Sequence, residues 1–236
     1  MKKLVIIPAY NESKNLLSVI RDIEAHAEGY DYVIINDAST DGTKELCEKY
    51  SLHYLDLASN LGIGGAVQTG YQYAALEGYD LAVQIDGDGQ HDAASLLELE
   101  EALLSGDPKP DLVIGSRFID KKGFQSTTIR RVAIRWISFL IKLLTGCRIT
   151  DPTSGFRICR REVIEIFAAK YPWDYPEPET TAGLLSRGYL VTEIPVEMKE
   201  RMGGKSSISS PLSALFYMIK VSFGIMIEAM EGGRRK

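Results

Sequence analysis

The strongest constraint on the fold of this chain is a series of short aliphatic runs separated by segments of helical length. Five runs have the length and composition of strands: Leu4–Pro8, Tyr32–Asn36, Leu81–Asp86, Leu112–Gly115 and a weaker one at His53–Leu57. Each is apolar on both faces, which is typical of a parallel sheet covered by helices on both sides. The alternation therefore predicts an α/β domain with a mostly parallel central sheet.

The segments between these runs predict helices. Their expected bounds are Ser13–His26, Thr43–Lys49, Gly64–Leu76 and Ala94–Leu104. Beyond about residue 126 the composition shifts to basic and apolar helices, and Leu190–Pro195 again has the pattern of a strand. A chain of 236 residues that is 45% hydrophobic can form one large domain or two small ones with a sizeable core.

Polar residues follow four of the expected strands. These segments are Pro8–Glu12, Asn36–Gly42, Asp86–His91 and Gly115–Arg117. In open α/β sheets, ligands bind outside the carboxyl ends of the strands. Four such ends rich in functional groups therefore predict one shared site.

The segment after the third run carries two carboxylates, Asp86 and Asp88. Positions i and i+2 of a strand project to the same face, roughly 6–7 Å apart, so the two acids can share one hard cation. Gln90 adds a neutral oxygen ligand, and Gly87 and Gly89 leave room for a large anionic ligand. A polar turn explains these residues as well when they are taken alone. The neighbouring strand ends favour the cation site.

Two segments partly match common nucleotide-binding motifs, but neither has all the required residues. Gly62–Val67 lacks the third glycine of a dinucleotide-binding turn and does not follow the first strand. Gly204-Lys205-Ser206 ends like a phosphate-binding loop, but Lys199 stands where the first glycine is required. A net charge of −5 gives no global case for nucleic acid, which is not expected as a partner.

The cysteines indicate a reducing compartment. Cys47, Cys147 and Cys159 are widely spaced and form no CxxC pair, and with only three histidines a structural zinc site is not expected. Reduced thiols are the default in the cytoplasm. The first apolar run is short and is interrupted at Pro8, which indicates a strand rather than an export signal. We therefore expect a cytoplasmic protein.

Five ordered motifs together resemble the family 2 glycosyltransferases, and most of all the branch of dolichyl-phosphate mannose synthases and polyprenyl-phosphate sugar transferases. The motifs are Pro8–Glu12, Asn36–Thr43, Asp86–His91, Gly115–Arg117 and Asp151–Arg157. The resemblance runs from the first strand to about Ser210. It implies a GT-A fold and an inverting transfer from a nucleotide-activated sugar, either a UDP- or a GDP-sugar.

The resemblance also implies roles for individual residues. The residues expected to bind the nucleotide are Pro8, Ala9, Tyr10, Glu12, Asp37 and Asp86. Asp37 would accept hydrogen bonds from the base. Asp86, Asp88 and Gln90 would hold Mg²⁺ or Mn²⁺ on the donor diphosphate, where a cation neutralises the charge of the leaving group.

Basic residues would bind the phosphates. The set implied by the resemblance is Arg117, Arg130, Arg201, Lys205 and Ser206. Arg117 and Arg130 match positions that contact an acceptor phosphate, although a serine often found four residues beyond Arg130 is Ile134 here. The loop that contains Arg201 also departs from its relatives, which tend to carry Lys at the position of Ser207.

The expected acceptor is an undecaprenyl-type polyprenyl phosphate, which is already anionic and needs no general base. A saccharide hydroxyl is the alternative acceptor and would need one, with Asp151, Glu177 and Glu179 as candidates. Glu177 and Glu179 equally fit charges at a helix start. Asp88, Asp151 and Arg201 form the expected catalytic set. A nucleotide-sugar-binding scaffold is the non-enzymatic alternative, disfavoured because the charged ligands are intact.

Two helical segments have patterns that suit a bilayer interface. Helical projection of Arg130–Leu144 groups Arg131, Arg135, Ser138 and Lys142 in one sector and leaves the remainder almost wholly apolar. Leu212–Met230 groups Ser213, Tyr217, Lys220, Gly224 and Glu228 in the same way, and the chain ends in Arg234, Arg235 and Lys236. Interfacial helices place cations near anionic headgroups in this manner. Packing on the sheet or in an oligomer is the alternative.

These patterns complete the expected organisation. Residues 1–210 form the catalytic domain, including an interfacial helix at about 128–145, and residues 211–236 form an amphipathic helix with a basic tail. Lys220 and Glu228 argue against a lone membrane-spanning helix. We expect a peripheral protein on the inner face of the plasma membrane. A small membrane-anchoring protein and a second copy of this chain, in a homo-oligomer, are candidate partners.

Overall fold

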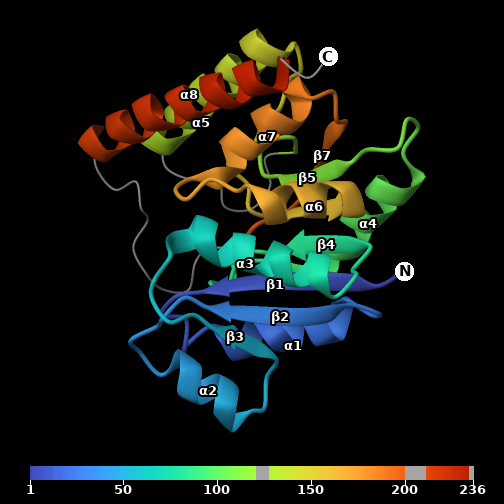
Figure 1. Cartoon of the computed structure of the whole chain (residues 1–236), viewed down its shortest axis with the longest axis vertical. Coiled ribbons are helices and arrows are strands. Elements are labelled where there is room, and N and C mark those ends of the chain that lie inside the picture. The colour runs from blue at the N-terminus through green and yellow to red at the C-terminus, as the bar shows by residue number, and fades with distance from the viewer. Residues whose placement is uncertain (121–127, 200–210, 234–236) are drawn as a thin grey trace.

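The computed structural model of the chain describes residues 1–120, 128–199 and 211–233 (Figure 1). Seven strands of this described part form one sheet in the order β3-β2-β1-β4-β6-β5-β7. They are β1 (Lys3–Ala9), β2 (Asp31–Asn36), β3 (Tyr54–Asp56), β4 (Leu81–Gln84), β5 (Leu112–Ser116), β6 (Arg157–Arg160) and β7 (Val191–Pro195). Neighbours pair in parallel except at β6, which is antiparallel to β4 and β5. The expected mostly parallel sheet is confirmed.

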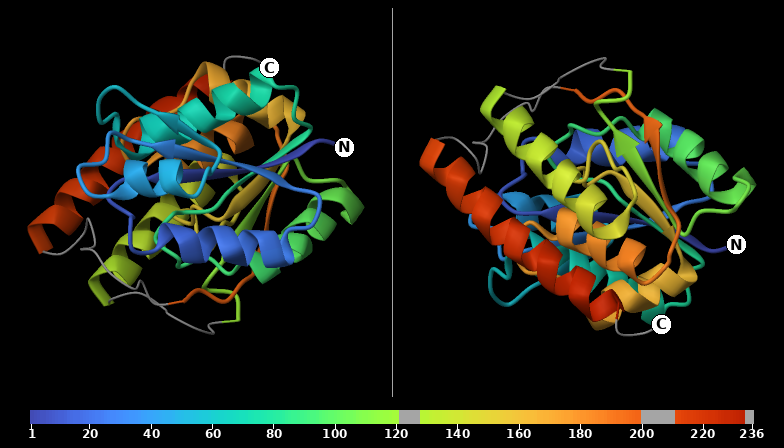
Figure 2. Two further views of the ribbon diagram at one scale, coloured as in Figure 1. Left: turned by 90° about the horizontal axis from the view of Figure 1, so that it is seen from below. Right: turned by 90° about the horizontal axis from the view of Figure 1, so that it is seen from above.

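Helices cover both faces of the sheet. They are α1 (Leu16–His26), α2 (Thr43–Lys49), α3 (Gly62–Leu76), α4 (Leu96–Ser105), α5 (Thr128–Thr145), α6 (Arg161–Ala169), α7 (Pro176–Ser186) and α8 (Pro211–Gly233), with a short 3-10 turn, η1 (Ala93–Ser95). One hydrophobic core joins the sheet to α1 and α4, and a second joins it to α3, α5, α6, α7 and α8 (Figure 2). In β1, Val5 and Ile7 enter the first core, and Leu4 and Ile6 enter the second.

The structure adds elements that the aliphatic pattern does not reveal. β6 carries an arginine at each end, and Arg157 is completely buried. Its guanidinium is satisfied by tertiary contacts, since it donates to the Ser154 carbonyl at 2.7 Å and the Thr180 hydroxyl at 3.1 Å. α7 lacks a helical apolar stripe because none of its residues is exposed and seven of the eleven are buried. The strand expected to end at Asp86 ends at Gln84, and the helix expected to begin at Ser13 begins at Leu16.

The polar face of α8, which carries Tyr217, Gly224 and Glu228, packs against the rest of the molecule. Tyr217 and Glu228 are buried, and Gly224 packs against the carboxyl group of Glu179 on α7. The outer face is apolar and carries exposed Leu215, Phe216, Ile219, Phe223, Ile227 and Met230. α8 contacts both α7 and α5. Over the described residues, no helix combines the length and apolar character needed to cross a membrane. A domain division at residue 210 stays a prediction, since residues 200–210 lie outside the described ranges.

An ionic cluster joins α7 to α8. Glu228 pairs with Arg187 at 3.0 Å and with Lys170 at 2.7 Å. The pKa of Glu179 is raised to about 7, first by burial and then by the nearby Glu228, while Lys220 and Lys170 act in the opposite direction. Asp174, which pairs with Lys220, adds to the increase. The folded protein therefore favours the protonated form of Glu179.

We predict that Glu179→Gln raises the melting temperature above neutral pH but not in acid. The pKa of Glu179 rises from 4.5 to about 7 on folding, so ionisation costs stability progressively between these values and fully above them. Thermal unfolding at about pH 8.5 and about pH 5 measures the difference. Glu101→Gln, which alters an exposed glutamate of α4, is the control. An equal shift at both pH values would contradict the prediction.

Candidate functional site

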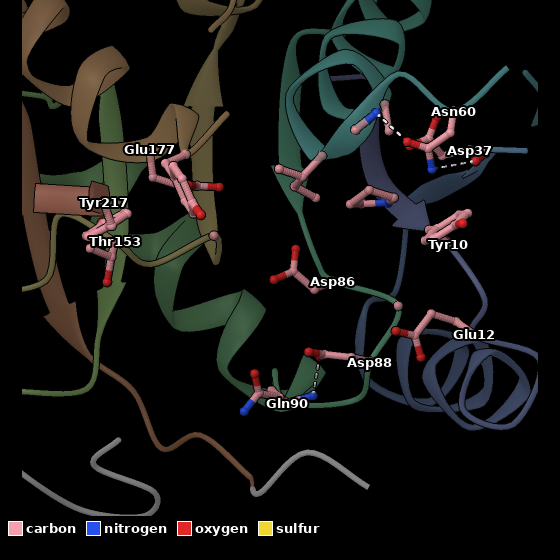
Figure 3. Close-up of a pocket in the computed structure, with 18 of the residues that line it drawn as sticks. Tyr10, Glu12, Asp37, Asn60, Asp86, Asp88, Gln90, Thr153, Glu177 and Tyr217 are labelled. Atoms are coloured by element: carbon pink, nitrogen blue, oxygen red, sulfur yellow. Dashed lines mark hydrogen bonds between the residues drawn. The ribbon is translucent and has the colours of Figure 1, made fainter. Parts of the chain in front are cut away.

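A cavity of about 480 Å³ lies beyond the carboxyl ends of β1, β2 and β4 (Figure 3). Most of the residues expected at a site line it together: Pro8, Ala9, Tyr10, Glu12, Asp37, Asp86, Asp88, Gln90 and Arg130. In Figure 3, Asp37, Asn60 and Tyr10 lie on one side, and Glu177, Thr153 and Tyr217 lie on the other. Asp86 lies between these two sides. The structure thus brings residues from three of the four expected strand ends, together with Arg130, to one cavity, whereas Gly115–Arg117 does not line it.

The loops after β1 and β2 are fastened to each other. The Asn11 side-chain oxygen accepts from the amides of Thr40 at 2.8 Å and Asp41 at 3.2 Å. The Glu12 amide donates to the Thr43 hydroxyl at 3.0 Å, and Thr43 is the first residue of α2. These bonds satisfy loop backbone groups that are otherwise left without a sheet partner. They hold Tyr10 and Glu12 at the cavity wall.

Asp37 positions a third loop. Its side chain is almost completely buried, and Oδ1 accepts from the Leu61 amide at 2.6 Å. The Asn60 side chain donates to the Asp37 carbonyl at 3.1 Å, so the residues before α3 are held against the end of β2. Asn60 lines the cavity but follows no recognisable spacing in the sequence. Recognition of a base by Asp37 stays a prediction.

The chain continues along β1 as far as Gly87, beyond the end of β4. The amides of Ile85 and Gly87 still donate to the carbonyls of Ile6 at 3.0 Å and Pro8 at 3.3 Å. A Cβ atom at Gly87 would approach the Pro8 carbonyl oxygen to 3.1 Å, so a glycine suits this close pairing. The pairing with β1 therefore explains the glycine at position 87, whether or not a ligand also approaches the backbone here.

Hydrogen bonds and one ring contact fix the conformation of the segment after β4 further. The Asp86 amide donates to His91 Nδ1 at 3.1 Å, and the His91 ring stacks on Phe156 with 5.1 Å between centroids. Asp88 Oδ1 accepts from the Gln90 amide at 3.0 Å. Asp86 Oδ1 accepts from the Gln84 side chain at 3.0 Å. Both carboxylates are thus oriented by neighbours while lining the cavity.

The donor set at this position fits a hard divalent cation. Two carboxylates and an amide oxygen are the ligand types that Mg²⁺ and Mn²⁺ prefer, and Mg²⁺ is commonly held by one or two carboxylates together with substrate phosphates. Over residues 1–120, 128–199 and 211–233, no cluster of three or more His, Cys, Asp or Glu side chains is arranged to hold a metal by itself. Asp86, Asp88 and Gln90 accordingly suit a cation that is shared with a phosphate ligand.

Arg117 and Asp151 form a buried pair behind the cavity wall. Arg117 Nε donates to Asp151 Oδ2 at 2.7 Å and Nη2 donates to Oδ1 at 2.8 Å. Asp151 has no exposed surface, and its amide donates to Glu193 at 2.7 Å. Arg117 also donates to the hydroxyl of Thr153, which does line the cavity. In this arrangement Asp151 orients Arg117. A phosphate contact for Arg117 and a catalytic role for Asp151 stay predictions.

Arg130 and Glu177 bring opposite charges to the same wall. Burial, followed by the proximity of Arg117, lowers the pKa of Arg130. Burial raises the pKa of Glu177 despite the nearby Arg157. Among the three carboxylates considered as bases, Glu177 lines the cavity, whereas Asp151 lies behind it and Glu179 packs against α8.

Some residues predicted for the site fall outside the described residues, and some residues that line the cavity were not predicted. Arg201, Lys205 and Ser206 lie within the undescribed segment 200–210, so their roles stay predictions. The lining residues that sequence reasoning did not assign to the site are Asn60, Gly62, Ile63, Ala66, Thr153, Gly155, Tyr175 and Tyr217. Most of them come from loops or helices that meet the site through tertiary packing, which no local pattern records.

Residues 4–167 match the family described as Glycosyl transferase family 2. The protein therefore belongs to this family. The polyprenol monophosphomannose synthase of Mycolicibacterium smegmatis is 30% identical in an alignment of 218 positions, which covers 88% of this chain and 81% of that protein. The undecaprenyl-phosphate mannosyltransferase of Micrococcus luteus is 31% identical in an alignment of 221 positions, which covers 89% of this chain and 88% of that protein.

The fold is also found among solved structures. Glucosyl-3-phosphoglycerate synthase from Mycobacterium tuberculosis, in complex with Mn²⁺, UDP and glucosyl-3-phosphoglycerate, matches with a TM-score of 0.68 and 20% identity. The match covers 98% of this chain and 79% of that chain. Together with the family match, this likeness confirms the expected α/β GT-A fold, a class of glycosyltransferase.

We predict that Asp151→Ala lowers the free energy of unfolding by about 3–5 kcal/mol, because it leaves the Arg117 guanidinium buried without its carboxylate. Chemical denaturation measures this loss. The double variant Arg117→Met, Asp151→Leu should recover much of it, since both charges are then replaced by apolar groups. An Asp151→Ala variant of unchanged stability that has lost activity would instead favour the catalytic role.

Proposed function

We propose that this protein transfers a sugar, with inversion, from a nucleotide-diphosphate donor to an undecaprenyl-type polyprenyl phosphate. The observation that carries the proposal is one cavity lined by Asp86 and Asp88 on the sheet edge and by Arg130 on α5. The carboxylates suit a cation on a donor diphosphate, and the arginine suits an anionic acceptor. The products would serve the synthesis of cell-surface polysaccharide or glycan.

The donor side is supported by the composition of the cavity. Pro8, Tyr10, Glu12 and Asp37 border the part assigned to the nucleotide, next to the oxygen ligands for Mg²⁺ or Mn²⁺. When bound, the cation neutralises the charge that grows on the departing nucleoside diphosphate. Both UDP- and GDP-sugars are compatible with these residues, and the sugar is a hexose or an N-acetylhexosamine.

The acceptor side is supported by the relatives and by chemistry. The two mannosyltransferase relatives are named for polyprenol or undecaprenyl phosphate. A phosphate acceptor is anionic before it reacts, so the attack on the sugar does not depend on a general base. A saccharide hydroxyl does depend on one, and Glu177 is the lining carboxylate that such a reaction would use.

The outer faces of α5 and α8 support attachment to a membrane surface. The exposed apolar residues of α8 from Leu215 to Met230 extend over about 22 Å at 1.5 Å per residue. α5 packs beside α8 and adds exposed Trp136 and Phe139, while Arg131 on α5 is also exposed. An apolar face accompanied by cations suits the interface of an anionic bilayer. We place the protein peripherally on the cytoplasmic face of the plasma membrane.

We predict that the purified protein transfers radiolabelled sugar to undecaprenyl phosphate in the presence of Mn²⁺. Asp88→Ala should lower the rate by at least about 100-fold, because charge on the leaving group is no longer neutralised. Asp80→Ala, at the opposite end of β4, is the matched control and should retain activity. Parallel reactions with UDP- and GDP-sugars identify the donor base. Near-normal turnover by Asp88→Ala, or transfer only to a saccharide primer, would refute the proposal.

Membrane attachment is tested separately by flotation with vesicles of phosphatidylglycerol and phosphatidylcholine. Phe223→Asp, on the exposed face of α8, should weaken binding by about tenfold or more, because it removes a large apolar side chain from the lipid contact. Leu76→Asp, at an apolar position on α3 that is even more exposed than Phe223, is the control and should bind as the wild type does. Equal binding by both variants would contradict the assignment of this face.

A further inference from the structure

Tyr217 brings α8 into the cavity. The residue is only 3% exposed and lines the same space as Arg130 and Ile134 of α5 and Glu177 of α7. Its ring meets that of Tyr175 edge-on, with 4.6 Å between centroids. Figure 3 shows Tyr217 next to Thr153 and near Glu177, on the wall opposite Asp37 and Tyr10. α8 is therefore part of the cavity wall as well as an outer layer.

We infer that Tyr217 binds the substrate, with its phenolic hydroxyl donating a hydrogen bond to the phosphate of the lipid acceptor beside Arg130. The inference rests on the proposed function and assigns a residue of the C-terminal helix to its acceptor subsite. A phosphate requires several donors, and charge-assisted hydrogen bonds to it are the strong ones. Arg130 and Tyr217 supply two donor groups from two different helices.

The surroundings of Tyr217 suit a hydrogen-bond donor. Burial and the nearby Glu177 raise the pKa of Tyr217, with Arg130 acting in the opposite direction, so the hydroxyl keeps its proton. The adjacent α5 position is Ile134, whose side chain has no donor. Arg117 is directed to Asp151 behind the wall. Burial raises the pKa of Glu177, so its carboxyl group is less readily ionised than a solvent-exposed one.

The same two helices also face the apolar part of such an acceptor. Phe216, the neighbour of Tyr217, is 63% exposed on the outer face of α8, and Trp136 on α5 is 43% exposed. The Trp136 side chain donates to the Ser222 hydroxyl at 3.0 Å, which fastens α5 to α8. Both helices begin on the same side of the molecule (Figure 2). α5 and α8 direct hydrogen-bond donors for a phosphate into the cavity and apolar side chains to the outside. An acceptor with a phosphate head and an apolar tail needs both.

The test is steady-state kinetics of Tyr217→Phe with a short-chain polyprenyl phosphate in detergent, varying acceptor and donor separately. This substitution keeps the ring on Tyr175 and removes only the hydroxyl. We expect kcat/KM for the acceptor to fall by about 10- to 100-fold, as the loss of one hydrogen bond to a charged group implies, and KM for the donor to stay unchanged. Tyr189→Phe, outside the cavity, is the matched control and should behave as the wild type does.

The possible results separate the inference from the proposed function. An unchanged kcat/KM for the acceptor in Tyr217→Phe, with an active wild type, overturns the inference alone. A raised KM for the donor with unaltered acceptor kinetics assigns the hydroxyl to the donor and also overturns it. A wild type that transfers no sugar to any polyprenyl phosphate overturns the proposed function and the inference together. Circular dichroism identifies a temperature at which both proteins are folded, so a less stable variant is still compared validly.

Discussion

The parallel pairing of β1 with β2 on one side and β4 on the other is the constraint on which the site depends. The registers Ala9↔Asn36 and Ile6↔Gln84 bring the ends of three strands to one edge of the sheet. Burial of both faces of β1 fixes this register, because a slip of one residue would exchange the side chains that enter the two cores. The residues that follow each strand, including Asp37 and Asp86, consequently meet at one cavity.

Packing of the second helical layer decides what else reaches this cavity. α7 lies between the sheet and α8, α5 packs beside α8, and α8 turns a stripe with Glu228 and Gly224 toward α7. In that seam, Glu228 is paired with Arg187 and Lys170. With its polar groups satisfied inside, the helix leaves large apolar side chains outside, an arrangement that water disfavours and that a lipid surface relieves. The proposed attachment and the proposed acceptor subsite thus have one structural origin.

The outcome for individual residues shows where sequence reasoning was sufficient. Asp86, Asp88 and Gln90 are close in the chain and follow a recognisable strand, so their shared position could be predicted from spacing alone. Arg117 and Asp151 lie 34 residues apart, and their bidentate contact forms only when the end of β5 meets the loop before β6. That contact places both behind the wall, although each belongs to a motif that suggests direct participation. Tyr217 could be assigned to a polar stripe, but the cavity it lines lies beyond any local pattern.

Local patterns determined the aliphatic strands, most helices on the covering layers and the cluster of oxygen-bearing side chains after β4, because hydrophobic periodicity and short-range spacing are properties of the chain itself. The antiparallel insertion of β6 was decided by tertiary structure, since a strand with buried Arg157 is stable only once Ser154 and Thr180 accept its hydrogen bonds. Tertiary structure also decided which face of α8 packs inward and which is exposed. An amphipathic pattern states that two faces differ, whereas the partners available to each face determine which one is buried.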